Sequence, residues 1–175
     1  MNKRIWISVA TVALMATVAV AGTMTPAEMT TKITNCPNCK AMANYPELMT
    51  NLRPDIFKTE SGFVSTFLVA DAKALPMCQK WEGECQANAA NPAMASSMCP
   101  ICVSYGSIMM NKDIKMESFM GSMGRVTVAS STTQAGKDAL HAHVALMQEA
   151  SAVMPAAMAE IMKSAKPKTT TASDN

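Results

Sequence analysis

In two stretches of the chain, runs of β-type residues flank a short glycine-bearing loop, which is the pattern of a β-hairpin. In the second half, Val126 and Val128 alternate with their neighbours along Arg125–Ser130, and Ile114–Phe119 precedes them. Period-two alternation indicates a half-buried strand, and glycine in a short turn between two such runs indicates a hairpin. In the first half the corresponding runs flank Glu60-Ser61-Gly62 and are Asp55–Thr59 and Phe63–Val69.

Helical segments are expected on both sides of each hairpin. The short ones that precede the hairpins are Lys40–Asn51 and Val103–Asn111. A longer helix is predicted over Asp71–Gln86, with Asp71 as its N-cap. The last helix is predicted to start at a Thr132 or Thr133 cap and to run to about Lys163, with a kink at Pro155.

The common order of elements predicts an α+β fold made of two pseudo-repeated helix–β-hairpin–helix units. The units are expected to span residues 22–86 and 99–163, with a linker at 87–98. Alanine, asparagine and serine dominate Ala87–Ser97, and this segment also contains Pro92, which favours a loop. The two hairpins are expected to join in one antiparallel sheet covered by helices, and residues 164–175 read as a disordered tail.

The N-terminus has the pattern of a secretory signal peptide. Lys3 and Arg4 precede an uncharged apolar run from Ile5 to Ala21, which ends in Ala19-Val20-Ala21 before Gly22. A basic start, an apolar centre and a small-residue end are typical of a cleaved export signal. The expected signal peptide is 1–21, and the expected location is periplasmic or secreted, with no membrane attachment after cleavage.

Charge argues against nucleic acid as a partner. The formal net charge is +2, and removal of Lys3 and Arg4 with the signal would bring it to zero. Aromatic residues make up only 5% of the chain. A protein that binds nucleic acid normally presents a basic surface, often with aromatic side chains for stacking. No nucleic-acid partner is expected.

All six cysteines and both histidines fall into one repeated arrangement. Cys36-Pro-Asn-Cys39 and Cys99-Pro-Ile-Cys102 lie 63 positions apart, and each is followed by a second pair of soft donors, Cys78 with Cys85 and then His141 with His143. Proline after the first cysteine favours the first position of a helix, which would place that cysteine at the N-cap. The helix dipole favours a thiolate at that place.

Helical periodicity indicates which members of the second donor pairs, Cys78 with Cys85 and His141 with His143, are able to reach one ion. Cys78 and Cys85 are seven residues apart, so they share one face of a helix but are separated by a rise of about 10 Å. Gly83 predicts an end of that helix, which would let Cys85 fold back. His141 and His143 are about 200° apart around a helix, and we expect His141 to face the ion and His143 to lie at the surface or behind the ligands. The candidate metal ligands are Cys36, Cys39, Cys78, Cys85, Cys99, Cys102 and His141.

Three functions are consistent with these donors. The first is an exported soft-metal binding protein that holds Cu(I) or Zn(II), without catalysis of its own and with a possible periplasmic partner protein that receives the metal. The second is a thiol–disulfide redox protein. The third is a binding module stapled by disulfides, because an exported chain meets an oxidising compartment and six cysteines allow three bridges.

Methionine is unusually frequent, with 18 residues. Met154, Met158 and Met162 recur every four residues, which is the ordinary spacing of a core-facing helical stripe. Met120 and Met123 lie in a glycine-bearing turn, where buried bulk is unusual. They are therefore the better candidates for thioether ligands of Cu(I).

The second half also resembles a loose group of small, uncharacterised bacterial proteins. The shared features are a Cys-Pro-x-Cys, a Tyr-Gly shortly after it, a glycine-bearing hairpin and a terminal His-Ala-His. They correspond here to Cys99–Cys102, Tyr105-Gly106, Met116–Val128 and His141-Ala142-His143. The resemblance supports the expected fold and supplies no function.

Overall fold

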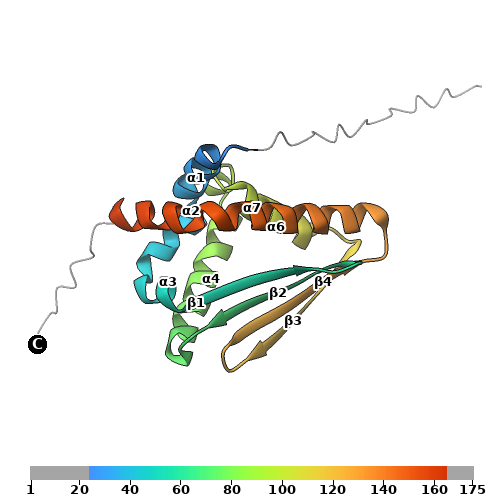
Figure 1. Ribbon diagram of the computed structural model, residues 1–175, viewed down its shortest axis with the longest axis horizontal. Coiled ribbons are helices and arrows are strands. Elements are labelled where there is room, and N and C mark those ends of the chain that lie inside the picture. The colour runs from blue at the N-terminus through green and yellow to red at the C-terminus, as the bar shows by residue number, and fades with distance from the viewer. Residues whose placement is uncertain (1–23, 165–175) are drawn as a thin grey trace, which may run out of the picture.

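The computed structural model describes residues 24–164 (Figure 1). The predicted signal peptide and all but the first residue of the predicted tail lie outside these residues. The described part is α+β, as expected, and consists of seven α-helices, two 3-10 turns and four strands. In chain order they are α1 (Pro26–Asn35), α2 (Pro37–Ala41), η1 (Met42–Asn44), α3 (Pro46–Asn51), β1 (Leu52–Lys58), β2 (Gly62–Val69), η2 (Ala72–Ala74), α4 (Leu75–Ala90), α5 (Pro92–Ala95), α6 (Pro100–Met110), β3 (Ile114–Gly121), β4 (Gly124–Ser131) and α7 (Gln134–Ser164).

Both predicted hairpins are present, and they form one antiparallel sheet in the order β1-β2-β4-β3. The first strands of the hairpins, β1 and β3, are the edges, and β2 and β4 pair at the centre with Val64 opposite Val128. A Cβ on Gly62 would lie 2.1 Å from the Ala129 carbonyl oxygen, and one on Gly124 would lie 2.2 Å from that of Phe67. Glycine therefore begins each central strand because the backbone of the other strand approaches it closely.

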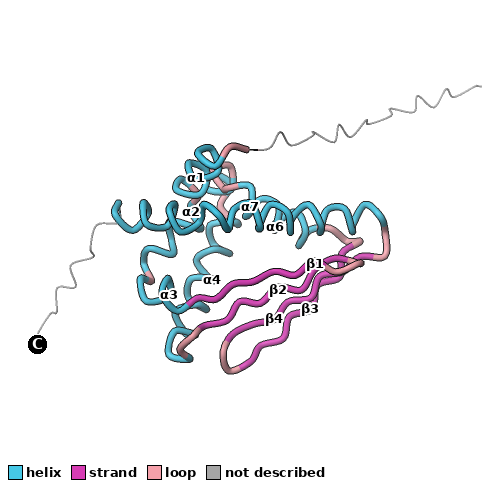
Figure 2. Tube along the Cα trace, viewed as in Figure 1, coloured by secondary structure: helices cyan, strands magenta, loops and turns pink. Residues whose placement is uncertain are grey.

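The helices lie on one side of the sheet (Figure 2). On that face Phe63 of β2 and Ala129 of β4 pack with Leu140 and Val144 of α7. At the other end of the same face, α4 covers the sheet, and Trp81 stacks on Phe67 with ring centroids 5.6 Å apart. Together, α7 and α4 therefore bury one face of the sheet.

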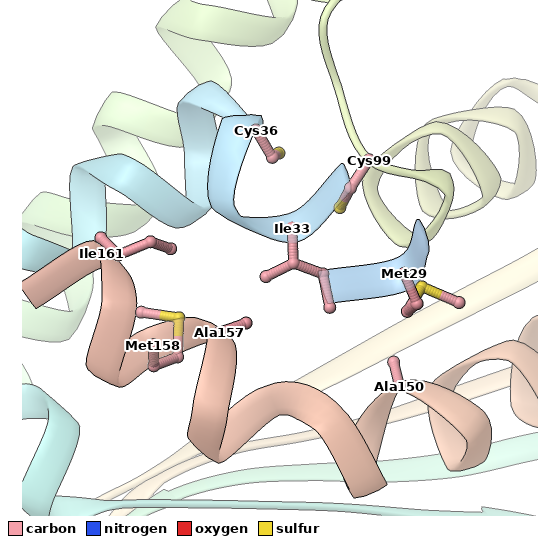
Figure 3. Close-up of a cluster of buried hydrophobic side chains, with 8 residues drawn as sticks. All are labelled: Met29, Ile33, Cys36, Cys99, Ala150, Ala157, Met158 and Ile161. Atoms are coloured by element: carbon pink, nitrogen blue, oxygen red, sulfur yellow. The ribbon is translucent and has the colours of Figure 1, made fainter. Parts of the chain in front are cut away.

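A second apolar layer lies between α1 and α7 and includes two of the cysteines (Figure 3). Met29 and Ile33 of α1 face Ala157 and Met158 of α7, and Cys36 and Cys99 are buried in the same cluster. Figure 3 shows Ile33 between the two cysteines and the side chains of α7. The start of each Cys-Pro-x-Cys motif is thus anchored in the core.

Three local expectations need correction. The α1 helix was not expected, although Thr25 and Glu28 form a capping box at its start and Met29 and Ile33 are spaced for one buried face. The α4 helix passes through Gly83 without ending. Residues 87–97 are mostly helical, since they hold the end of α4 and all of α5. The α7 helix runs through Pro155 to Ser164, as predicted, with Ala157, Met158 and Ile161 buried beyond the proline, and the expected kink stays a prediction.

The two expected capping side chains are confirmed. The Asp71 side chain accepts from the Lys73 amide at the start of η2, which leads into α4. The Thr133 hydroxyl accepts from the Gly136 amide just inside α7. None of the described helices combines the length and the apolar composition that a bilayer span needs. The order of helix, hairpin and helix recurs in both halves, while a duplication stays a prediction.

Candidate metal centre

The two Cys-Pro-x-Cys motifs adopt the same local structure. Cys36 and Cys99 are N-caps with extended backbone, at φ −67°, ψ 127° and φ −69°, ψ 160° respectively. The proline that follows each is the first residue of a helix, α2 or α6, and the second cysteine is the third residue. Proline suits this position because its fixed φ is helical and the amide it lacks would have no partner in the helix. Each motif therefore presents two thiols at the amide-rich start of a helix.

The four thiols of the two motifs meet at one point. The Sγ atoms of Cys36, Cys39, Cys99 and Cys102 all lie within 4.8 Å of one another. The Sγ atoms of Cys36 and Cys102, from different motifs, are 3.7 Å apart. A tetrahedral zinc ion with bonds of about 2.3 Å separates its sulfur ligands by about 3.8 Å. The pocket therefore already has the dimensions of a four-thiolate metal site.

Burial differs within each motif. Cys36 and Cys99 are fully buried in the apolar layer between α1 and α7, whereas Cys39 and Cys102 are partly exposed. Met42 and Ile101 are among the partly buried residues packed against that layer. All six cysteines are free thiols in the structure. The site is therefore enclosed on the core side and approachable at Cys39 and Cys102.

Asn38, the middle residue of the first motif, contacts the cluster through its side chain. The side-chain Nδ2 lies 3.8 Å from the Cys102 Sγ, and the backbone carbonyl oxygen of Asn38 accepts a hydrogen bond from Trp81 Nε1 at 3.1 Å. An N–H directed at a sulfur stabilises thiolate and is typical of the surroundings of metal-bound cysteine. Asn38 thus joins the two motifs and also fixes α4 against α2.

The pKa values of the four thiols split into two pairs. Contact with the thiols of Cys102 and Cys39 holds the pKa of Cys36 far below its usual value. Contact with Cys102 likewise lowers the pKa of Cys99, helped by the backbone of Cys102. The pKa values of the other two thiols are raised: that of Cys39 mainly by contact with the Cys102 thiol and then with Cys36, and that of Cys102 mainly by contact with Cys36. Four crowded thiols do not all ionise unless a cation compensates their charge.

Cys85 lies near this cluster without belonging to it. One turn before it on α4, Trp81 contacts the carbonyl oxygen of Asn38, so this face of α4 is directed toward α2. Burial, followed by the charge of Cys36, raises the pKa of Cys85 to about 12. The expected break of α4 at Gly83 was wrong, and Cys85 therefore has no fold-back to bring it to the ion.

Cys78 lies in a different core, with Leu48, Val69 and Ala74. Burial raises its pKa to about 11. Because α4 is unbroken, two turns of helix separate Cys78 from Cys85. The structure thus gathers four of the seven predicted ligands and leaves Cys78, Cys85 and His141 outside the group.

The burial of the two histidines is the reverse of what was expected. His141 is half-buried, and its Nε2 lies 2.9 Å from the Thr59 carbonyl oxygen. His143 is only 3% exposed, packs between Phe63 and Tyr105, and places Nδ1 3.0 Å from the Ser104 hydroxyl. Burial lowers the pKa of His143, so the neutral form is favoured. The signal was in the sequence: His143 follows Leu140 by three residues and therefore shares its buried face.

The methionine predictions also divide. Met158 is buried in the layer between α1 and α7, with Met154 packed against it, as expected for core packing. Met120 and Met123 are exposed at the end of the β3–β4 hairpin, and neither packs in the layer that holds the cysteines. Asn38 is the residue that the sequence did not single out, and its place between two cysteines was the available signal.

Comparison with protein-family models, with curated proteins and with solved structures found no match in any of the three. The geometry of the cluster therefore carries the functional assignment. Four free thiols at metal-binding spacing are compatible with a bound metal ion as partner.

Proposed function

We propose that this protein is an exported soft-metal binding protein that holds one Zn(II) ion by Cys36, Cys39, Cys99 and Cys102. The observation that carries the proposal is the mutual distance of the four Sγ atoms, all within 4.8 Å. The ion would join the start of α2 to the start of α6 and so link the two halves of the chain inside the apolar layer. No catalytic role is proposed.

The donor set favours Zn(II) over Cu(I). Four thiolates in a closed tetrahedral arrangement are typical of structural zinc sites. Cu(I) is favoured by soft sites that include thioether, and the two methionines expected to supply it, Met120 and Met123, are exposed at the hairpin end. Cu(I) bound by the same thiols is the alternative that metal analysis distinguishes.

The exposure of the cysteines disfavours the thiol–disulfide redox alternative. A redox motif needs a reactive thiolate that a partner reaches. Here the thiols whose pKa is lowered, Cys36 and Cys99, are fully buried. The stapled-module alternative is disfavoured as well, because all six cysteines are free and four of them crowd one point.

The test is the metal content of protein purified under reducing conditions with zinc and copper both supplied. We expect about one zinc per chain in the wild type by elemental analysis and native mass spectrometry. Cys36→Ser and Cys102→Ser should each lose at least about tenfold in zinc affinity, since three thiolates remain. Cys78→Ser and Cys85→Ser are matched controls on α4 and should keep the full zinc content.

Two results would refute the proposal. One is a folded wild-type protein without metal that contains three disulfides. The other is equal loss of zinc in all four variants, which would mean that the pocket does not select its ligands. Copper in place of zinc at the same four cysteines would keep the site and change the metal.

Export is the second part of the proposal and rests on the N-terminal pattern. Lys3 and Arg4, the apolar run to Ala21 and the small residues before Gly22 support cleavage after residue 21. The mature chain would then meet metal ions and a possible partner protein outside the cytoplasm. Intact mass of protein from the exported fraction should correspond to Gly22–Asn175, and a full-length mass in the cytoplasmic fraction would contradict export.

A further inference from the structure

The sheet face turned away from the helices is apolar along its middle. Side chains alternate between the two faces of a strand, so the residues between those that pack on α7 point the other way. Val64 lies between Phe63 and Ser65, and Val128 lies between Thr127 and Ala129. In the described part of the chain, the helices lie on the opposite side of the sheet (Figure 2).

The pairing register arranges this outer face in rows across the strands. One row is Phe57, Val64, Val128 and Glu117, and the next is Asp55, Thr66, Val126 and Phe119. Phe57 and Phe119 are 53% and 59% exposed, and they lie on opposite edges of the sheet. Two edge phenylalanines with valines between them form a continuous apolar band, which marks an interaction surface.

The charges around the band are balanced. Asp55 and Arg53 lie on β1, and Glu117 and Lys115 lie on β3, all on the outer face. Lys115 Nζ and Glu117 Oε1 are 3.1 Å apart. Each edge strand therefore carries one acid and one base, and the face has no net charge. Such a face complements a copy of itself better than it complements a strongly charged partner.

The size of the face corresponds to a weak dimer. Four strands about 4.8 Å apart, paired over about seven residues of about 3.3 Å each, give a projected area of about 450 Å² per copy. The pair would bury about 900 Å², which is below the about 1,000 Å² of specific stable interfaces and within the range of weak, transient ones. Two sheets packed face to face at about −30° are a common arrangement in proteins.

We propose that two copies of this chain associate through these outer sheet faces, and that Phe57 and Phe119 contribute most of the binding energy. The metal cluster takes no part in this interface, since its four cysteines belong to the helical side. The association and the metal site are therefore independent properties. Exposed aromatic side chains that become buried in an interface commonly carry a large share of its binding energy.

The test is sedimentation velocity of the purified exported protein at concentrations from about 5 to about 200 µM, a range suited to a small interface. We expect the wild type to shift from monomer toward dimer across this range. Phe57→Lys with Phe119→Lys should weaken association by at least about tenfold. Met110→Lys is the matched control, because Met110 is apolar and 87% exposed on α6, away from the sheet.

A wild type that stays monomeric at the highest concentration overturns the proposal, whatever else covers the face. So does a dimer that the double variant leaves intact while far-UV circular dichroism shows a native fold. If the double variant fails to fold, Phe119→Ser alone is expected to weaken the dimer and provides the same decision. Zinc content measured on the same samples separates this outcome from that of the metal site.

Discussion

Cys36 and Cys99 share two features. Each occupies the N-cap position of a helix without a side-chain capping hydrogen bond, and each is fully buried in an apolar layer. Burial alone raises the pKa of a thiol, while neighbouring thiols and helix amides lower it. The second influence is the stronger one at both positions, and the protons are displaced to Cys39 and Cys102. Within the cluster, negative charge is thus favoured on the buried pair and the protons on the partly exposed pair.

This split predicts that zinc binding releases protons. The raised pKa values of Cys39 and Cys102 keep both thiols protonated at neutral pH in the metal-free protein. Zinc needs thiolate, so the ion displaces both protons, and its affinity rises with pH. Two displaced protons correspond to a rise of about a hundredfold in affinity per pH unit. Chelator competition at several pH values measures it, and an affinity that does not change with pH would contradict the split.

At the scale of elements, the continuity of α4 decides which thiols meet. Gly83 lies within the helix, and a Cβ placed on it would find no atom within 4 Å. The glycine therefore weakens the helix without breaking it, because neighbouring residues hold α4 in place. Trp81 contacts Phe67 and Asn38, and Glu82 pairs with Arg125 at 2.9 Å. Cys78 and Cys85 consequently stay two turns apart.

The two helical glycines in α4 and α7 are expected to respond oppositely to alanine. Gly83→Ala should raise the free energy of unfolding by about 0.5–1 kcal/mol, since alanine is the better helix former and meets no neighbour. Gly136→Ala should lower it, because the new Cβ would lie 2.1 Å from the Ser131 hydroxyl oxygen. Urea unfolding of both variants checks this, and a destabilised Gly83→Ala protein would mean that α4 needs glycine there.

At the scale of the whole molecule, the cluster ties the N-terminal helices to α6 and, through the apolar layer, to α7. The sheet joins the same two halves a second time through β2 and β4. The junction in the sheet is made by backbone hydrogen bonds, and the junction at the cluster is made by four cysteine side chains. The two halves of the chain are therefore joined twice, and the metal site is one of the two junctions.

Removal of zinc is expected to lower the stability of the whole protein. A ligand that binds only the folded state at about a hundred times its Kd contributes about 2.7 kcal/mol. The free energy of unfolding of the wild type, measured in urea with reductant, should fall by about this amount when a chelator replaces zinc. Cys102→Ser should respond less to the exchange, because its zinc affinity is lower. Equal stability of the wild type in both conditions would show that the cluster does not hold metal in the fold.

The sequence by itself determined much of the local structure. Glycine-bearing loops between β-type runs specified both hairpins, and proline after cysteine specified the N-cap position of Cys36 and Cys99, because turns and caps depend on a few neighbouring residues. The helical stripe of Met154 and Met158 was readable for the same reason. The capping box of α1 and the place of His143 on the Leu140 face were also encoded locally, and were overlooked.

Only the tertiary structure decided which donors share a point in space. Cys36 and Cys102 are 66 residues apart in the chain, and their 3.7 Å approach depends on how α1, α6 and α7 pack. The same packing sends Cys78 into another core and leaves His141 beside Thr59. Spacing along a chain limits which groups are able to meet, whereas burial of apolar faces determines which of them do.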